Sequence, residues 1–497
     1  MLPWVVLVSC LVLLLALVDW RQGVLGLLVV VVLQDVFRKL TPSAPSYFIL
    51  WTGALFALIF LVAYAQGAVR GLRPLYLHDS GLRRAWWLFF LMVLLQGAHT
   101  LERLGNPMVA TLGLIFYFAP VAALLVGIAY ARSERQIERF VITYVLIMVP
   151  TALTVYLSPE YAKDWPVLRD VGSFTGAALV ISGDRGPLLS HPGLLRVGEL
   201  AAWHAATAIA FISVLVIRRP SLLLRILAGL AIIALLGAII LTGRRKMLMT
   251  LTIFFTLQWT LLIVLRQGLN RLTVTVLVMI LAGSLAFALL GQDKPQADRR
   301  NSAYVQRGLS VFESADERLD RSIDLLNAAW YRAGVLGIGA GMAGQGARYA
   351  GGTDAEDEDE DEDEEDARAG RIQGAAEAGV GMIVVELGGA GAAIVLWLLY
   401  RLATRLWFGV GLLGDSLLVY AASFSALLIA NMATFGAANQ LYGDHAVLIL
   451  LGLVAGMLFA SVNAGIKLKR RQTQLQQKAL GSGRPSGPAN RLRPGVR

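Results

Sequence analysis

Long apolar runs separated by short polar stretches recur from one end of the chain to the other. A transmembrane helix needs about 20 mostly apolar residues, with a range of about 17–25. The pattern predicts about thirteen spans, near residues 3–18, 23–37, 46–69, 85–105, 108–130, 140–157, 196–217, 222–242, 247–265, 271–290, 378–400, 407–431 and 444–463. Outer-membrane barrel strands would instead show about ten residues of alternating hydrophobicity. The expected fold class is an all-α polytopic membrane protein with about 12–13 transmembrane helices and two long extracytoplasmic loops.

The polar stretches between these spans set the expected orientation. Basic residues recur in one consistent phase, in loops 70–84, 132–139, 218–225, 266–271 and 401–405 and in the tail from Lys467. The positive-inside rule places these loops in the cytoplasm. The expected divisions are N-terminal helices 1–157, outer loop 158–195, central helices 196–290, large outer loop 291–377, C-terminal helices 378–463 and a basic disordered cytoplasmic tail 464–497.

Composition narrows the class of protein. The 497 residues are 57% hydrophobic and only 16% charged, against about 25% charged in soluble domains, which excludes a soluble enzyme. One cysteine, Cys10, and five histidines without an H-E-x-x-H motif predict no metal site, and we expect no cofactor. The basic residues are spread over many short loops, so we expect no nucleic-acid partner.

The large outer loop holds an acidic run. Twelve of the thirteen residues from Asp354 to Asp366 are acidic, and without them the net charge would rise from +10 to +22. The run has no EF-hand spacing. We expect a solvated, disordered insertion, because like charges repel one another; loose binding of divalent ions is the alternative.

One short basic loop lies on the unexpected, outer side. Arg244, Arg245 and Lys246 follow Thr242-Gly243 at the end of a predicted span. Long basic side chains at a helix end can simply extend to the membrane surface. The functional alternative is an anion-binding site, which we favour.

The second outer loop contains a predicted surface helix. Arg318, Arg321 and the region of Trp330 recur at helical spacing, with both arginines on one face. An ordinary solvated amphipathic helix is the alternative. Because the guanidinium fork binds phosphate oxygens in pairs, arginines here and at Arg244 could hold a diphosphate between them.

The seventh span carries polar residues at its outer end. Arg196, Glu199, Trp203 and His204 recur at three- and four-residue spacing, so they share roughly one face. This face predicts a polar cavity. An ion pair that packs two helices together is the alternative.

A glycine-rich stretch and two glutamates follow in the large loop. Residues Gly339 to Gly344 match G-x-G-x-x-G, but no strand precedes them, so we reject a dinucleotide site and expect a close-packed loop. Glu386 is buried in a small-residue span, where a hydrogen bond to a neighbouring helix or an arginine is expected. Glu377 lies at the outer boundary, where we favour a functional role.

These pieces, in this order, resemble the O-antigen ligase and O-antigen polymerase superfamily. The similarity rests on Leu241 to Arg245, Arg318 to Arg332, Gly337 to Gly341 and Glu377 to Gly391, and covers roughly residues 220–400. The family usually has a histidine nine residues before the glutamate that corresponds to Glu386. Here that position is Glu377, so the assignment of the base stays open.

The resemblance implies a metal-independent glycosyltransferase of the bacterial inner membrane. Its substrate would be a glycan on undecaprenyl diphosphate, transferred at the outer face by polymerisation or ligation. The implied catalytic residues are Glu377, Arg244, Arg245 and Arg321. Residues expected to bind substrate are Arg318, Arg196, Glu199, His204, Trp330 and Lys246.

Two other classes stay open. One is a transporter or flippase of a lipid-linked or anionic substrate, in which repeats and broken helices near mid-membrane are common. The other is a structural subunit of an envelope complex with a degenerate site. Expected partners are the lipid bilayer, the lipid-linked glycan and other envelope polysaccharide assembly proteins.

Overall fold

The chain is an all-α polytopic membrane protein. The computed structural model describes residues 1–69, 71–76, 79–171, 179–181, 187–219, 221–265, 304, 315–343, 378–438 and 440–482. Its longer helices are α1 (Leu2–Val18), α2 (Trp20–Leu40), α3 (Ile49–Ala65), α4 (Ser80–Leu104), α5 (Pro107–Tyr130), α6 (Glu134–Leu153), α8 (Gly198–Arg218), α9 (Leu222–Leu241), α10 (Lys246–Val264), α13 (Ala315–Ala333), α15 (Gly379–Val410), α16 (Asp415–Ala437) and α17 (His445–Ser482). Within these residues, eight segments are long and apolar enough to cross a membrane.

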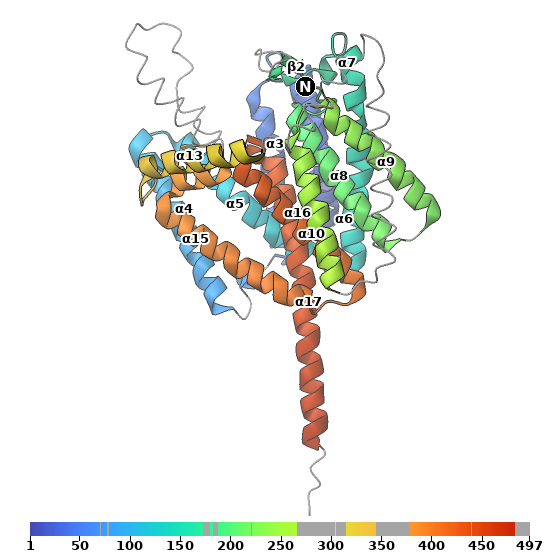
Figure 1. The fold of residues 1–497 in the computed structure, drawn as a ribbon, viewed down its shortest axis with the longest axis vertical. Coiled ribbons are helices and arrows are strands. Elements are labelled where there is room, and N and C mark those ends of the chain that lie inside the picture. The colour runs from blue at the N-terminus through green and yellow to red at the C-terminus, as the bar shows by residue number, and fades with distance from the viewer. Residues whose placement is uncertain are drawn as a thin grey trace, which may run out of the picture.

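Short elements fill the connections. They are α7 (Ser158–Tyr161), the 3₁₀ turns Ser46–Phe48, Arg73–Leu75, Thr154–Leu157, Pro166–Leu168 and Gln440–Gly443, and the antiparallel strands β1 (Leu179–Ile181) and β2 (Pro187–Leu189). The sequence pattern did not predict this hairpin. We call the side that carries α7 and the hairpin the α7 side, and the side from which the end of α17 projects the tail side (Figure 1).

Local sequence explains where individual helices begin and end. The turn between α4 and α5 is Gly105-Asn106-Pro107. Gly105 ends α4 in the left-handed conformation, with φ of 62°, and the Asn106 side chain accepts the N–H of Met108 at 3.0 Å. Pro107 follows at the first helical position, where its missing N–H leaves no bond unmade.

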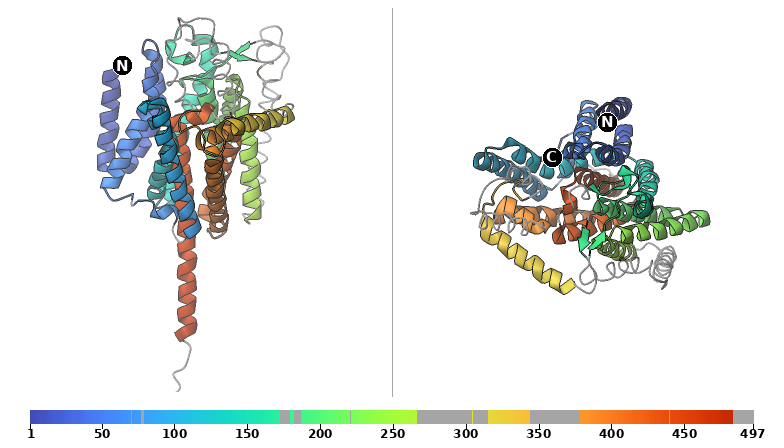
Figure 2. Two further views of the ribbon diagram at one scale, coloured as in Figure 1. Left: turned by 90° about the vertical axis from the view of Figure 1, so that its left-hand side faces the viewer. Right: turned by 90° about the horizontal axis from the view of Figure 1, so that it is seen from above.

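The bundle is built around α8. Every residue of α8 from Gly198 to Ile217 is buried. Seen from above, α1–α3 gather at one edge of the bundle and α13 lies at the opposite edge (Figure 2). Helices α5 and α17 approach so closely that a side-chain carbon added at Gly127 or Gly456 would collide with the backbone of the other helix, as expected where small residues line membrane-helix contacts.

Polar contacts tie together the loops on each side. On the α7 side, Lys39 donates to the carbonyl of Gly193 at 2.7 Å. On the tail side, Arg401 donates to Asp79 at 2.5 Å and Arg219 to Glu138 at 2.7 Å. Burial raises the pKa of Asp79, but the Leu82 N–H and Arg401 outweigh it and hold the pKa of this carboxyl below its usual range.

Several predicted boundaries need correction. Residues 401–405, expected as a loop, lie within α15, and the spans expected at 378–400 and 407–431 correspond to α15 and α16. The tail 464–497, expected to be disordered, is helical to Ser482 as the end of α17. After the predicted span 444–463, apolar residues recur at 466, 468 and 475. From residue 466 to residue 480 there is no glycine or proline to end the helix. The span predicted at 271–290 lies outside the described residues.

Helix α15 is broken on the α7-side half of its length. Gly388 has φ of 70° and ψ of −179° and interrupts the helix. The backbone after α13 fills the break: Ile338 donates to the carbonyl of Val385 at 2.9 Å, and Gly389 donates to that of Gly334 at 3.0 Å. These bonds satisfy the backbone groups that the break would otherwise leave unpaired in the membrane.

We predict that Gly388→Ala strongly destabilises the fold. The added carbon would collide with the backbone at Gly337 and Val335, and the positive φ alone costs about 1–3 kcal/mol. Thermal unfolding of the purified protein in detergent should show a clear loss. Gly414→Ala is the matched control, because Gly414 has φ of −73° and an added carbon meets nothing within 4 Å. Equal unfolding temperatures for the two variants would contradict the prediction.

Candidate functional site

The turn between α9 and α10 presents the outer basic cluster. Gly243 has φ of 68°, a conformation that favours glycine, and this allows the tight turn. The Thr242 hydroxyl accepts the N–H of Arg244 at 3.2 Å, and the Thr242 carbonyl accepts the hydroxyl of Ser190 at 3.2 Å. The loop after β2 therefore holds the turn in place.

The cations of this turn face carboxylates of the first outer loop and of α8. Lys246 forms an ion pair with Glu199. Burial lowers the pKa of Arg244 from its ordinary value, and the charge of Asp170 opposes that shift. Within the described part of the chain, Arg244 Nε is buried and has no hydrogen-bond partner. Arg244 thus offers a desolvated N–H donor on a cation, which is the chemistry that an anion requires.

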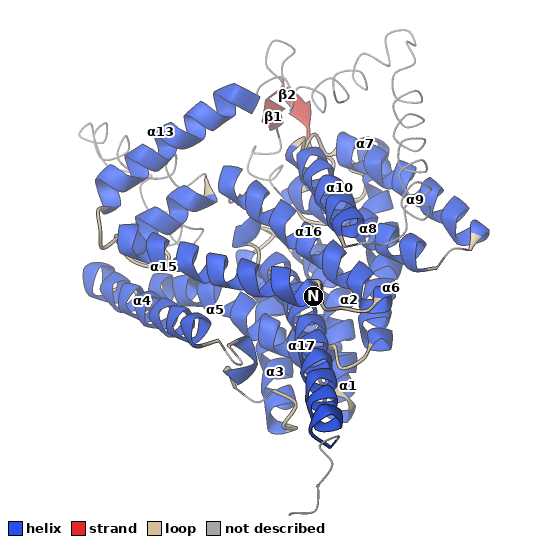
Figure 3. Cartoon of the chain, turned by 60° about the horizontal axis from the view of Figure 1, so that its bottom comes forward, coloured by secondary structure: helices blue, strands red, loops and turns tan. Residues whose placement is uncertain are grey.

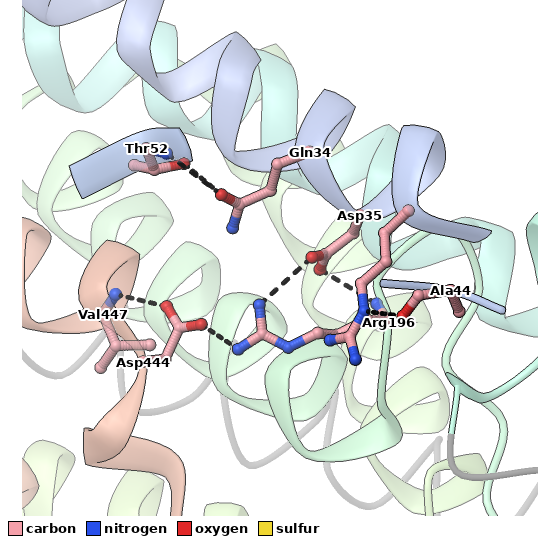
Figure 4. A network of polar contacts seen from close by, with 8 residues as sticks. Gln34, Asp35, Ala44, Thr52, Arg196, Asp444 and Val447 are labelled. Carbon is pink, nitrogen blue, oxygen red and sulfur yellow. Dashed lines mark hydrogen bonds and ion pairs between the residues drawn. The ribbon is translucent and has the colours of Figure 1, made fainter. Parts of the chain in front are cut away.

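Arg196 has a different environment, between two carboxylates (Figure 4). Its Nη1 lies 3.2 Å from Asp35 Oδ1, its backbone N–H donates to Asp35 Oδ2 at 3.0 Å, and its Nη2 pairs with Asp444. Asp444 also caps α17 by accepting the N–H of Val447 at 3.0 Å. Burial raises the pKa of Asp444, but the charge of Arg196 outweighs it and holds that pKa below its usual range. We call Asp35, Arg196 and Asp444 the ion triad.

The deeper polar residues of α8 are also engaged by protein. His204 Nδ1 lies 2.8 Å from the hydroxyl of Tyr144, and Trp203 donates to Asn431 at 2.7 Å. Both residues are buried. The polar cavity expected along this face is therefore not present at Arg196, Trp203 or His204, whose contacts are those of the helix-packing alternative. Bulky neighbours and complementary polar partners fill the space.

The glycine-rich stretch is a packed insert. Gly339 donates to the carbonyl of Glu386 at 3.2 Å, and Ala340 donates to that of Gln96 at 3.2 Å. Glu386 accepts the hydroxyl of Tyr117 at 2.8 Å and the N–H of Ala343 at 3.1 Å. The expected hydrogen bond from Glu386 to a neighbouring helix is confirmed, and these N–H groups are engaged by protein and not turned toward a ligand.

The other candidates lie on or near α13. Arg318 and Arg321 fall in its first two turns, where the backbone is described. The N-terminal end of α13 points toward the side of the bundle that carries the β1–β2 hairpin (Figure 3), and the hairpin lies above the level of the helix (Figure 2). Trp330, at the other end, packs against Gly389. Glu377 lies outside the described residues.

A large apolar cavity lies between the membrane-spanning helices. It has a volume of about 1180 Å³ and lies between α15, α16 and α17, with walls also from α4, α5 and α10. Its lining is almost wholly apolar and aromatic, including Trp86, Tyr117, Phe435 and Trp407. On α10 the lining begins at Leu257, eleven residues after Lys246, which is about 16 Å along the helix. The basic cluster and the cavity therefore lie toward opposite ends of α10.

Sequence reasoning missed the carboxylates that complete this region and the cavity itself. Asp35, Asp170 and Asp444 are buried acidic residues. Asp35 and Asp444 are acidic residues at the ends of long apolar runs. Such a position indicates a carboxylate that is paired within the protein, so these two could have been predicted. The cavity had no such signal, because apolar residues that face a cavity and those that face lipid look alike in a sequence.

No family model matches this chain, and no curated protein matches its sequence.

We predict that Arg196→Met destabilises the protein by about 3–5 kcal/mol, because two buried carboxylates lose the cation between them. Chemical unfolding of the purified protein in detergent measures the loss. The triple variant Asp35→Asn, Arg196→Met, Asp444→Asn should recover most of it, since the buried charges are gone and asparagine still caps α17. Wild-type stability of Arg196→Met would show that the ion triad does not constrain the fold.

Proposed function

We propose that this chain is a glycosyltransferase of the bacterial inner membrane that polymerises or ligates glycan units carried on undecaprenyl diphosphate. The α7 side would be the outer face. One observation carries the proposal: α10 begins beside the basic cluster with the desolvated Arg244 and, from Leu257 onward, lines an apolar cavity of about 1180 Å³. A ligand that suits both has an anionic head and a long apolar chain.

The head-group chemistry rests on the cations of the α7 side. Arg244 offers a buried donor, and Lys246 adds a second charge beside it, partly neutralised by Glu199. Arg318 and Arg321 lie in the first two turns of α13, whose N-terminal end points toward the side of the bundle that carries the hairpin. Two sets of cations on one face suit the two phosphates of a diphosphate.

The cavity supplies the complementary apolar surface. A hydrocarbon chain bound in such a cavity makes van der Waals contacts with the aromatic and aliphatic side chains that line it. On α15 the cavity is lined by Ile383 and by residues between Val395 and Val410. A polyprenyl chain is apolar in the same way.

The proposed step is a substitution at the anomeric carbon. The oxygen of an acceptor hydroxyl forms the new bond to that carbon, and the bond from the carbon to the diphosphate oxygen breaks. The proton of the hydroxyl goes to a base, for which Glu377 is the candidate. The bonding electrons leave with undecaprenyl diphosphate, whose added negative charge Arg244, Arg245 and Arg321 would stabilise.

One observation favours the alternative, a transporter or flippase. Transporters commonly bind substrate at broken helices, and α15 is broken at Gly388, close to the buried Glu386. The two functions differ in product: the enzyme forms a new glycosidic bond, and the transporter moves an unchanged substrate.

We predict that Arg244→Ala, Arg245→Ala and Arg321→Ala each lower glycan transfer by about 100-fold, since each removes a cation from the leaving group. The assay follows undecaprenyl diphosphate release from the native lipid-linked glycan by the protein in proteoliposomes. Arg332→Ala is the control, because Arg332 is exposed on α13 and has no assigned role. Normal turnover by all three variants would remove the diphosphate site from the proposal.

A second prediction concerns the base. Glu377→Gln should lower transfer by about 10²–10⁴-fold while the protein still inserts into the membrane. In a strain that lacks the native copy, this variant should leave single lipid-linked units on the outer face, and wild type should restore polymer. Units that accumulate on the cytoplasmic face in the deletion strain would instead establish the transporter.

A further inference from the structure

The end of α13 exposes apolar and aromatic side chains that no described part of the chain covers. One face of the helix packs Leu326 and Ala329 against Val384 and Val385 of α15. Beside that face, the exposed fractions are 48% for Ile323, 50% for Trp330, 88% for Tyr331, 62% for Val335 and 71% for Leu336. We call these five residues the α13 patch. A soluble surface rarely gathers such side chains.

The spanning part of α15 sets the depth of this patch. Residues Gly379–Val410 form one segment that is long and apolar enough to cross a membrane. Gly389 lies ten residues after its start and therefore within the membrane-spanning part of α15. Trp330 packs directly on Gly389, so its ring lies at the same depth.

Helix α4 gives a second, independent depth. The Leu336 carbonyl accepts the side-chain amide of Gln96, and Gln96 lies eight residues before Leu104, the last residue of α4. Eight residues correspond to about 12 Å along the helix. Leu336 thus lies about 12 Å before the end of α4, beside the turn of that helix that carries the exposed leucines 94 and 95.

We propose that α13 lies in the water–lipid interface on the α7 side and that the α13 patch contacts bilayer lipid. Three observations support lipid as the occupant. The patch is joined to α4 by the hydrogen bond from Gln96 to the Leu336 carbonyl, it contains tryptophan and tyrosine, which favour the interface, and α13 lies crosswise to α17 (Figure 1). An amphipathic helix in this orientation buries its apolar side at the boundary between head groups and acyl chains.

This placement has a consequence that rests on the proposed function. Arg318 and Arg321 belong to the same helix, so they would be held at head-group depth. A lipid-linked diphosphate could then reach them by diffusing within the leaflet, without leaving the membrane.

Spin labelling tests the lipid contact without any activity assay. Cys10 is the single cysteine, so Cys10→Ser provides the background. Labels at Ile323→Cys and Leu336→Cys are compared with labels at Asp324→Cys and Arg332→Cys, exposed polar positions on the same helix. Leu230→Cys, on the exposed surface of the membrane-spanning helix α9, is the lipid reference. The protein is reconstituted in phosphatidylethanolamine–phosphatidylglycerol vesicles, and collision rates with oxygen and with a water-soluble nickel chelate are measured.

We expect the oxygen-to-nickel ratio at Ile323→Cys and Leu336→Cys to be several-fold higher than at the two polar positions and to approach that of Leu230→Cys. Nickel access equal to that at Asp324→Cys would overturn the proposal. Exclusion of both reagents with dipolar broadening between labels would also overturn it, because a second copy would then cover the patch. If Leu336→Cys does not fold, Tyr331→Cys replaces it, since an 88% exposed side chain makes little packing contact. Loss of transfer activity with an intact lipid signal would count against the proposed function alone.

Discussion

The arrangement of the α7 side depends on one buried cation, Arg196, between Asp35 and Asp444. Its partners come from α2 and from the start of α17, so three distant segments meet at one guanidinium. Removing one charge from such a buried pair lowers the free energy of unfolding by about 3–5 kcal/mol. Any conformation that separates these charges is therefore strongly disfavoured. Arg196 directly precedes α8, so the ion triad also fixes where α8 begins. Glu199 follows within the first turn and holds Lys246 at the start of α10.

A second constraint places α13. The break at Gly388 would expose backbone groups to hydrocarbon, where each unpaired group costs several kcal/mol. The stretch after α13 supplies the partners through Ile338 and Gly339. Because that stretch follows α13 directly, closing the break also holds α13 against α15. The amphipathic helix is therefore set at its depth by backbone hydrogen bonding as well as by side-chain packing.

The sequence predicted the features that depend on local composition. Long apolar runs predicted most of the spans. Arg244 and Lys246 were predicted to be functional because positive charges are unexpected on the outer side of a membrane helix. Features that depend on partners far apart in the chain could not be predicted. Arg196 looked like a ligand-binding residue because nothing local reveals that Asp35, 161 residues away, and Asp444 neutralise it. Likewise, Gly388 stood in a run of small residues typical of helix packing, and the break became visible only with its partner segment.

The way in which the break is filled bears on the choice between enzyme and transporter. In transporters, unwound backbone at a broken helix coordinates ions or substrate. Here the described backbone around Gly388 bonds to Gly334, Val335, Ile338 and Gly339 of the same chain, and Glu386 bonds to Tyr117 and Ala343. A substrate at this break would have to displace hydrogen bonds that are already made. By contrast, an anion that accepts a hydrogen bond from Arg244 Nε displaces no described hydrogen-bond partner. These contacts support the proposed site at the membrane boundary over a site at the break, and with it the proposed enzyme over a transporter.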